Sequence, residues 1–265
     1  MHVRTFTYVA IAAAAALTAC RGGFRVNRFP KNESLYSAGV QEYQRKHWGN
    51  AILAFEKLTN DLPARDTLLP RSYWYLGNAH EHQGEHLLAA QSFTRLYESF
   101  PDDTLADDAA LASARAYRKL WRKPTLDATY GETALATYNT LLGLYGETSE
   151  HADVARREIA ELEQWFATKN YETGMFYFRM KAYDSAILYF KYVIERWPNV
   201  ARARDALLRL AESYKAIKYR DDYNDTCAKL RQTYPGDREI VRVCGDAKAP
   251  EAPTVAPPRP ASRGD

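Results

Sequence analysis

A short motif that recurs along the chain constrains the fold more than any other feature. In each copy an Ala and an aromatic residue stand four positions apart, and a Pro follows eight residues later. Residues four apart share one face of a helix, and Pro ends a helix, so each copy predicts one helix and its stop. The copies are Ala51, Phe55 and Pro63; Ala89, Phe93 and Pro101; Ala186, Phe190 and Pro198; and a degenerate copy with Tyr223, Cys227 and Pro235.

A small residue precedes each copy. Gly39, Gly77, Gly174 and Ala211 take this place in turn. A small residue on a first helix lets a second helix approach closely, and the two parts together match the tetratricopeptide (TPR) pattern. A lone helical hairpin cannot bury the apolar side chains on its outer face, so such hairpins stack on one another. The chain is therefore predicted to be all-α, an α-solenoid of about five TPR-like helical hairpins.

The third unit departs from the template. Its first helix is expected over 105–121 and its second over 132–145, with an insertion at 122–131 that contains Pro124. That loop is about nine residues longer than in the neighbouring units, by comparison of the motif spacings. After it, 151–179 has the pattern of one extended helix.

The N-terminus has the pattern of an export signal. A short polar head precedes the apolar run 8–17, which is too short to cross a bilayer as a helix. Leu17, Thr18, Ala19 and Cys20 follow, and they resemble the lipobox of bacterial lipoproteins. The resemblance implies diacylglycerol on the sulfur of Cys20, cleavage before it and acylation of the new amino terminus. An ordinary secretory signal with an incidental cysteine is the alternative.

The landmarks divide the chain into consecutive segments. The expected segments are 1–19, a lipoprotein signal peptide; 20–32, the lipidated Cys and a flexible tether; 33–104, TPR units 1 and 2; 105–247, TPR units 3 to 5 with the insertion at 122–131 and a C-terminal capping helix; and 248–265, a disordered Pro-rich tail. The residue after Cys20 is Arg21, whereas Asp there is the usual inner-membrane retention signal. The expected location is therefore the periplasmic face of the outer membrane, with contact to the bilayer through lipid.

Composition excludes some classes of function. Hydrophobic residues make up 46% of the 265 residues, enough for a large core. The formal charge is only +3 and basic residues are interspersed with acidic ones, so nucleic acid is not an expected partner. No glycine loop for phosphate, nucleophile elbow or Cys/His nucleophile pair is visible. We expect neither an enzyme nor a cofactor other than the lipid on Cys20.

Three histidines invite a metal hypothesis. His82 and His86 are four residues apart and His80 is close by, but they straddle Gly84, where the template places a turn. Paired Cys ligands and an H-E-x-x-H pattern are both lacking. Aromatic packing is the favoured role, and no metal site is expected.

Two cysteines remain once Cys20 carries lipid. Cys227 takes the inward-facing site where other repeats have Phe or Tyr, and Cys244 lies in the expected capping helix. Because the second helix of one unit packs on the next element, the two sulfurs could meet in a disulfide. Two buried free thiols are the alternative.

The number of hairpins, the lipobox and the split third unit resemble the BamD/ComL family, the TPR lipoproteins of the outer-membrane β-barrel assembly machine. The resemblance covers about 34–236 and is closest over 151–214. It implies a scaffold that assists assembly and insertion of β-barrel proteins. Its implied partners are the barrel-forming subunit with POTRA domains, the accessory lipoproteins of that machine, and the C-termini of unfolded outer-membrane proteins. A generic periplasmic TPR lipoprotein that scaffolds Tol–Pal or peptidoglycan complexes is the alternative.

Two sets of residues are candidates for these contacts. By the TPR template, first-helix residues line a peptide groove, and an aromatic end with a carboxylate would suit it. The groove candidates are Tyr36, Val40, Tyr43, Arg71, Trp74 and Asn78. The resemblance implies that the last units dock the POTRA region, where Arg202, Arg204 and Arg209 form a basic stripe. Ordinary helix-face residues are the alternative for both sets.

Overall fold

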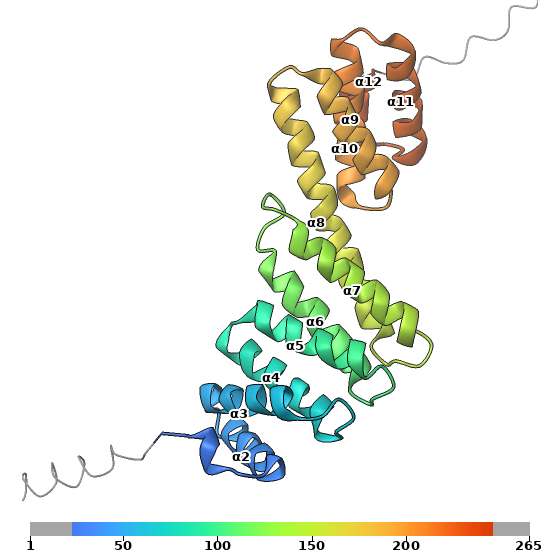
Figure 1. Cartoon of the computed structure of the whole chain (residues 1–265). Coiled ribbons are helices and arrows are strands. Elements are labelled where there is room, and N and C mark those ends of the chain that lie inside the picture. The colour runs from blue at the N-terminus through green and yellow to red at the C-terminus, as the bar shows by residue number, and fades with distance from the viewer. Residues whose placement is uncertain (1–22, 246–265) are drawn as a thin grey trace, which may run out of the picture. The chain divides into compact units, whose positions relative to one another are not determined.

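The computed structural model describes residues 23–245, and over that range the chain is helical without a strand (Figure 1). The elements are η1 Val26–Arg28, α2 Asn32–Gln44, α3 Trp48–Asp61, α4 Leu68–Gln83, α5 His86–Ser99, α6 Ala106–Leu120, α7 Thr129–Tyr145, α8 Ala152–Arg179, α9 Tyr183–Arg196, α10 Ala201–Ala216, α11 Arg220–Thr233 and α12 Arg238–Cys244. The prediction of an all-α chain of TPR-like hairpins is confirmed.

The chain divides into two compact units. Within the described residues, the first comprises 23–122 and 127–159, and the second comprises 123–126 and 160–245. The boundary therefore falls inside α8, which is the single extended helix that the sequence predicts for 151–179.

The first unit is built from three hairpins that follow one another along the chain. Each of the helices α2 to α7 packs on the next, and α2 also contacts α4. The Ala and Phe of the recurring motif form the interior: Ala51, Phe55, Ala89 and Phe93 are at most 2% exposed. The motif thus marks the buried face of the second helix in each hairpin.

The second unit repeats this packing. Phe190 of α9 is buried and meets Tyr171 of α8 with ring centroids 5.7 Å apart. Next, α10 packs on both α9 and α11, and α12 contacts α10 and α11. The capping helix expected after the fifth hairpin is therefore present as α12.

Within a hairpin the small residue and the ring of the motif lie in direct contact. A Cβ added to Gly77 would come 2.6 Å from Cε1 of Phe93, and one added to Gly174 would come 2.7 Å from Cε1 of Phe190. Only glycine permits this approach of backbone to ring. The fifth hairpin has Ala211 and Cys227 in these two places, and both are buried.

The turn between the two helices of a hairpin has a left-handed residue. Gly84 takes this conformation in the second hairpin with φ of 77°. In the first, fourth and fifth hairpins the residue is a lysine: Lys46, Lys181 and Lys218 have φ of 60–65°. An L-residue is strained there, so these turns carry a local cost of about 1 kcal/mol each.

The insertion in the third hairpin is shorter than the sequence predicts. The structure begins α7 at Thr129, so 129–131 are helical where a loop is expected. Asp127 accepts a hydrogen bond from the Thr129 amide at 3.0 Å, and the buried ring of Trp121 lies against Gly131. The Asp127 carboxylate and the Trp121 ring therefore stabilise a start of α7 that is three residues earlier than the sequence predicts.

The expectation of a flexible tether over 20–32 is wrong for the described part of that segment. Phe24, Val26 and Phe29 are partly buried against the core of the first hairpin, and the rings of Phe24 and Phe29 stack at 5.6 Å. Val26–Arg28 form the 3-10 turn η1 between the two rings. The three apolar side chains anchor this stretch because their burial removes apolar surface from water.

Candidate functional site

A cluster of aromatic rings lies on the first helices of the first two hairpins. Tyr36 and Tyr43 of α2 each meet Tyr75 of α4 edge-on, with ring centroids 6.2 Å and 5.1 Å apart. Tyr75 also stacks nearly flat on buried Phe55 of α3, at 5.1 Å. Such offset and edge-on contacts are favourable for aromatic rings. The three tyrosines are only half-buried, so part of each ring stays accessible to a ligand.

Arg71 lies one helical turn before Tyr75 and beside Tyr36. Its side chain is exposed. Burial, and then the neighbouring Tyr75, raises the pKa of Tyr36, and Arg71 offsets part of that rise. The structure thus brings Tyr36, Tyr43 and Arg71 close together through Tyr75, and their role in a peptide groove stays a prediction.

Arg71 also lines an open hollow of about 690 Å³ between the loops that precede α4 and α6. Arg65 and the half-buried ring of Phe100 line it too. The acidic residues of these loops, Asp66 and Asp103, each accept a hydrogen bond from a backbone amide, of Leu68 and Leu105 respectively. Asp66 and Asp103 line the hollow as well, so its lining combines two arginines, two carboxylates and the apolar surface of Phe100.

The other three groove candidates face their own helices or the core. Val40 packs, partly buried, against the core of the first hairpin. Trp74 meets the buried ring of Phe93 at 5.4 Å, and the Asn78 side-chain amide donates to the Trp74 carbonyl at 2.8 Å. These three residues thus make packing contacts or a bond to their own helix, and their role in a groove stays a prediction.

Tyr75 was missed by the template, although helical spacing could have found it. It stands four residues after Arg71 and so shares its face. Trp48 and His82, which extend the cluster, were also missed: their rings stack at 4.1 Å and both approach Tyr43. No local pattern pairs Trp48 with His82, because they meet only when α3 and α4 pack.

The arginine candidates at the other end are paired within the chain. Arg202 lies over the ring of Tyr171 at 4.8 Å and pairs with Asp205 at 3.1 Å. Arg209 pairs with Glu212 at 2.5 Å. Carboxylates of the same unit thus pair with all three arginines, and their role in docking a partner stays a prediction.

Arg204 shows this pairing most clearly. It binds Asp237 at 2.5 Å and Glu239 at 3.1 Å, both at the start of α12, and also Asp205 at 3.1 Å. The hydrogen bond from Arg204 lowers the pKa of Asp237, and the hydrogen bond to Asp237 raises the pKa of Arg204. Asp237 also accepts from the Glu239 amide and so caps α12. Arg204 thus holds the first turn of the capping helix to α10.

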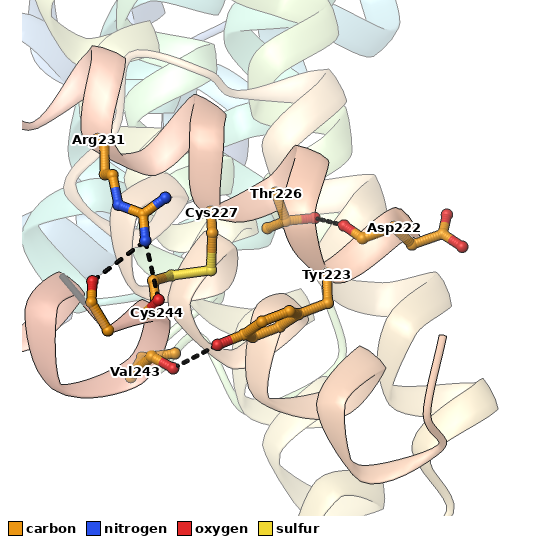
Figure 2. The surroundings of a disulfide bond; sticks show 8 residues. Asp222, Tyr223, Thr226, Cys227, Arg231, Val243 and Cys244 are labelled. Atoms are coloured by element: carbon orange, nitrogen blue, oxygen red, sulfur yellow. Dashed lines mark hydrogen bonds between the residues drawn. A yellow bond between two sulfur atoms is a disulfide. The ribbon is translucent and has the colours of Figure 1, made fainter. Parts of the chain in front are cut away.

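The far end of α12 is held by covalent and hydrogen bonds (Figure 2). Cys227 of α11 and Cys244 of α12 are joined in a disulfide. The Tyr223 hydroxyl donates to the Val243 carbonyl at 2.8 Å, and Arg231 donates to the Cys244 carbonyl at 2.8 Å. A seven-residue helix is not stable alone, so these bonds and the buried Ile240 and Val243 keep it in place.

The histidines around Gly84 bond to neighbouring acids or stack on rings. His80 is 4% exposed, and its Nδ1 lies 2.7 Å from Glu85; Nδ1 of His86 lies 2.9 Å from Glu81. Across residues 23–245 no three His, Cys, Asp or Glu side chains form a group that could hold a metal ion.

Some predicted features lie outside the described residues. They are the signal peptide, the lipobox of Leu17, Thr18 and Ala19, the anchor Cys20 and the tail 248–265. Of the helices that are described, none has the length and apolar character needed to span a bilayer.

Solved structures similar to this chain include TPR proteins. A thermophilic TPR protein of Thermus thermophilus is 19% identical, with 80% of this chain and 97% of that chain covered and a TM-score of 0.35. The TPR domain of P58(IPK) is 14% identical, with 80% and 54% covered and a TM-score of 0.43.

Two curated relatives share one name, outer membrane protein assembly factor BamD. The protein of Caulobacter vibrioides is 29% identical over 244 residues, which cover 89% of this chain and 78% of the relative. That of Xylella fastidiosa is 23% identical over 196 residues, 69% of this chain and 65% of the relative. The model of the YfiO family, described as outer membrane lipoprotein, matches residues 30–230. The chain therefore belongs to the YfiO family of outer membrane lipoproteins, as its resemblance to BamD/ComL predicts.

Proposed function

We propose that this protein is a non-enzymatic scaffold of the outer membrane that assists the assembly and insertion of β-barrel proteins. The proposal is supported by membership of the YfiO family and by two relatives named as outer membrane protein assembly factors. TPR-type hairpins fit such a role because stacked helices present an extended surface to other proteins.

The observation that carries the proposal is Arg71 beside the tyrosine cluster. An arginine holds a carboxylate through two parallel hydrogen bonds, and the half-buried rings of Tyr36 and Tyr75 offer edges and faces to another ring. A C-terminal segment of an unfolded barrel protein, with an aromatic last residue, combines those two groups. We infer that this face receives such segments.

Docking to the barrel-forming subunit through its POTRA domains, and contact with accessory lipoproteins, complete the proposal. The family resemblance assigns the POTRA contact to the last hairpins. Because Arg202, Arg204 and Arg209 are paired with carboxylates of the same unit, a partner would bind there through other side chains or by exchange of those pairs.

Membrane residence is proposed to depend on lipid at Cys20. Diacylglycerol together with an acyl chain on the amino terminus gives stable anchoring where one chain gives only marginal binding. The Cys227–Cys244 disulfide is consistent with export, because disulfides persist in oxidising compartments such as the periplasm.

Crosslinking in intact cells, followed by affinity purification from detergent-solubilised outer membrane, tests the proposal. Recovery of an integral β-barrel protein with POTRA domains is expected. Recovery of Tol–Pal components or peptidoglycan-linked proteins alone would contradict the proposal and favour a general envelope scaffold. A Cys20→Ser variant should leave the membrane fraction, and its retention there would contradict lipid anchoring.

A further inference from the structure

A pocket lined by three tyrosines lies at the turn between α10 and α11. Its volume is about 220 Å³, and Tyr214, Tyr219 and Tyr223 line it together with three basic side chains, Lys215, Lys218 and Arg220. The rings of Tyr214 and Tyr219 are nearly parallel, 15° apart, with centroids 6.4 Å apart. Tyr219 is 54% exposed, so its ring is accessible from solvent.

The chain leaves the described structure beside this pocket. The Tyr223 hydroxyl donates to the Val243 carbonyl at 2.8 Å, so the end of α12 touches one wall of the pocket (Figure 2). Lys215 lies over the face of the same Tyr223 ring, at 5.8 Å from its centroid. Twenty residues, 246–265, follow Gly245 in the sequence.

Those residues include two proline-containing runs of opposite charge. Pro250 and Pro253 flank Glu251, whereas Pro257, Pro258 and Pro260 surround Arg259. Proline-rich segments favour the polyproline II conformation, and aromatic-lined grooves recognise it. As far as the structure describes it, the pocket lining holds three cations and no carboxylate, so it favours the first run over the second.

We propose that Pro250–Pro253 of the same chain docks in the tyrosine pocket. A proline ring packs against Tyr214 and Tyr219, and the Glu251 carboxylate faces Lys218 and Arg220. The reach is sufficient, because Pro250 lies five residue steps after Gly245, and five steps span about 15 Å in polyproline II conformation. A short tether of this kind gives an effective concentration on the order of 1 mM, so even weak affinity fills the pocket. This proposal does not depend on the proposed function.

Fluorine NMR of the mature chain labelled with 3-fluorotyrosine tests the proposal, with Cys20→Ser to remove the lipid. Loss of the signal in a Tyr219→Phe variant assigns the Tyr219 resonance. The Tyr219 resonance is expected to move when residues 246–265 are deleted, and to move to the same position in a Pro250→Ala/Pro253→Ala variant. The matched Pro257→Ala/Pro260→Ala variant should leave it unchanged.

Addition of a peptide with the sequence of 247–255 to the truncated chain should restore the original resonance, with a Kd of about 1 mM or tighter. The proposal is wrong if the full and truncated chains give the same Tyr219 resonance, or if the second proline pair controls it. A resonance position that depends on protein concentration would also overturn it, since the segment would then come from a second copy. Circular dichroism of each variant confirms that the helices are intact.

Discussion

The ring of Phe93 in α5 lies directly on the backbone of Gly77 in α4, where an added Cβ would come 2.6 Å from Cε1. Gly77→Ala forces the ring or the helix to move, and overpacking of this kind lowers the free energy of unfolding by about 1–3 kcal/mol. Gly143 in α7 provides the control, because an added Cβ there meets nothing within 4 Å. Gly143→Ala should raise the free energy of unfolding by about 0.5–1 kcal/mol through helix propensity. Urea unfolding of both variants measures the difference, and equal effects would contradict the packing argument.

A partly buried carboxylate in the first unit, Glu158, should make the stability of that unit depend on pH. Burial alone would raise the pKa of Glu158, but hydrogen bonds from Arg115 at 2.6 Å and Tyr138 at 2.5 Å outweigh it and lower that pKa. A carboxyl group with a lowered folded pKa stabilises the protein fully above its unfolded pKa, near 4.5, and loses this contribution as pH falls through the folded pKa.

Glu158→Gln should therefore lower the free energy of unfolding at pH 7 by about 1–2 kcal/mol and by less at pH 3. The estimate stays low because Arg115 is 46% exposed and solvent screens the pair. Asp153→Asn, which breaks an exposed pair with Arg156, should change stability by under about 0.5 kcal/mol at either pH. The measurement is urea unfolding at the two pH values, and an equal loss for Glu158→Gln at both would rule out the proposed ionisation.

Removal of the disulfide should loosen the end of the second unit. Cys227 and Cys244 close a loop of 17 residues, which corresponds to about 3 kcal/mol of stabilisation by restriction of the unfolded chain. A Cys227→Ser/Cys244→Ser variant should lose about that amount and show faster hydrogen exchange over 238–244. Reductant should reproduce the loss in the parent chain and have no effect on the variant. If exchange over α12 is unchanged, the remaining bonds of Arg204 and Tyr223 suffice to hold it.

The left-handed lysines predict a stabilising substitution. Lys181 ends the fourth hairpin's first helix with φ of 60°, so Lys181→Gly relieves strain and should raise the free energy of unfolding by about 0.5–1 kcal/mol. Lys191→Gly, at an exposed helical position of α9, should instead lower it by about 1 kcal/mol. Thermal unfolding of the two variants compares them directly, and a shift in the same direction for both would argue against strain at the turn.

The proposed peptide face predicts a coupling between Arg71 and a ligand carboxylate. Arg71→Ala should weaken binding of a synthetic peptide with a C-terminal aromatic residue about tenfold, equal to about 1.4 kcal/mol. Amidation of the peptide should weaken it by a similar factor, and the two changes together should cost little more than either alone. Calorimetric titration gives the four affinities, and strictly additive losses would show that Arg71 does not contact the carboxylate.

The repeating part of the fold follows from the sequence because it depends on local spacing. Ala and Phe four residues apart fix the buried face of a helix, and the proline fixes its end, so the hairpins and the long α8 are predictable. The start of α7 was missed because it depends on the contact between the Trp121 ring and Gly131, and this contact forms only when the insertion folds. Likewise Phe24 and Phe29 look like linker residues until the first hairpin supplies a core for them.

The candidate sites were less predictable, since their partners come from distant residues. Arg204 resembles a free surface charge in sequence, yet Asp237 and Glu239 reach it from a helix more than 30 residues away. Tyr75 was overlooked because the TPR template marks its neighbour Trp74, while the packing of α2 against α4 decides which ring meets Tyr36. Spacing identifies a helix face, but tertiary contacts decide whether that face is available.

In the fifth hairpin, Ala211 and Cys227 stand where the first, second and fourth hairpins have Gly and Phe. This difference determines how the last helix is attached. A phenyl ring would fill the interior and leave no atom able to react with a neighbour. Cys227 and Ala211 are both small and buried, so this position stays part of the apolar interior. The cysteine at this position of the repeat thereby supplies a point of covalent attachment, so α12 is joined to the fifth hairpin by a disulfide as well as by packing.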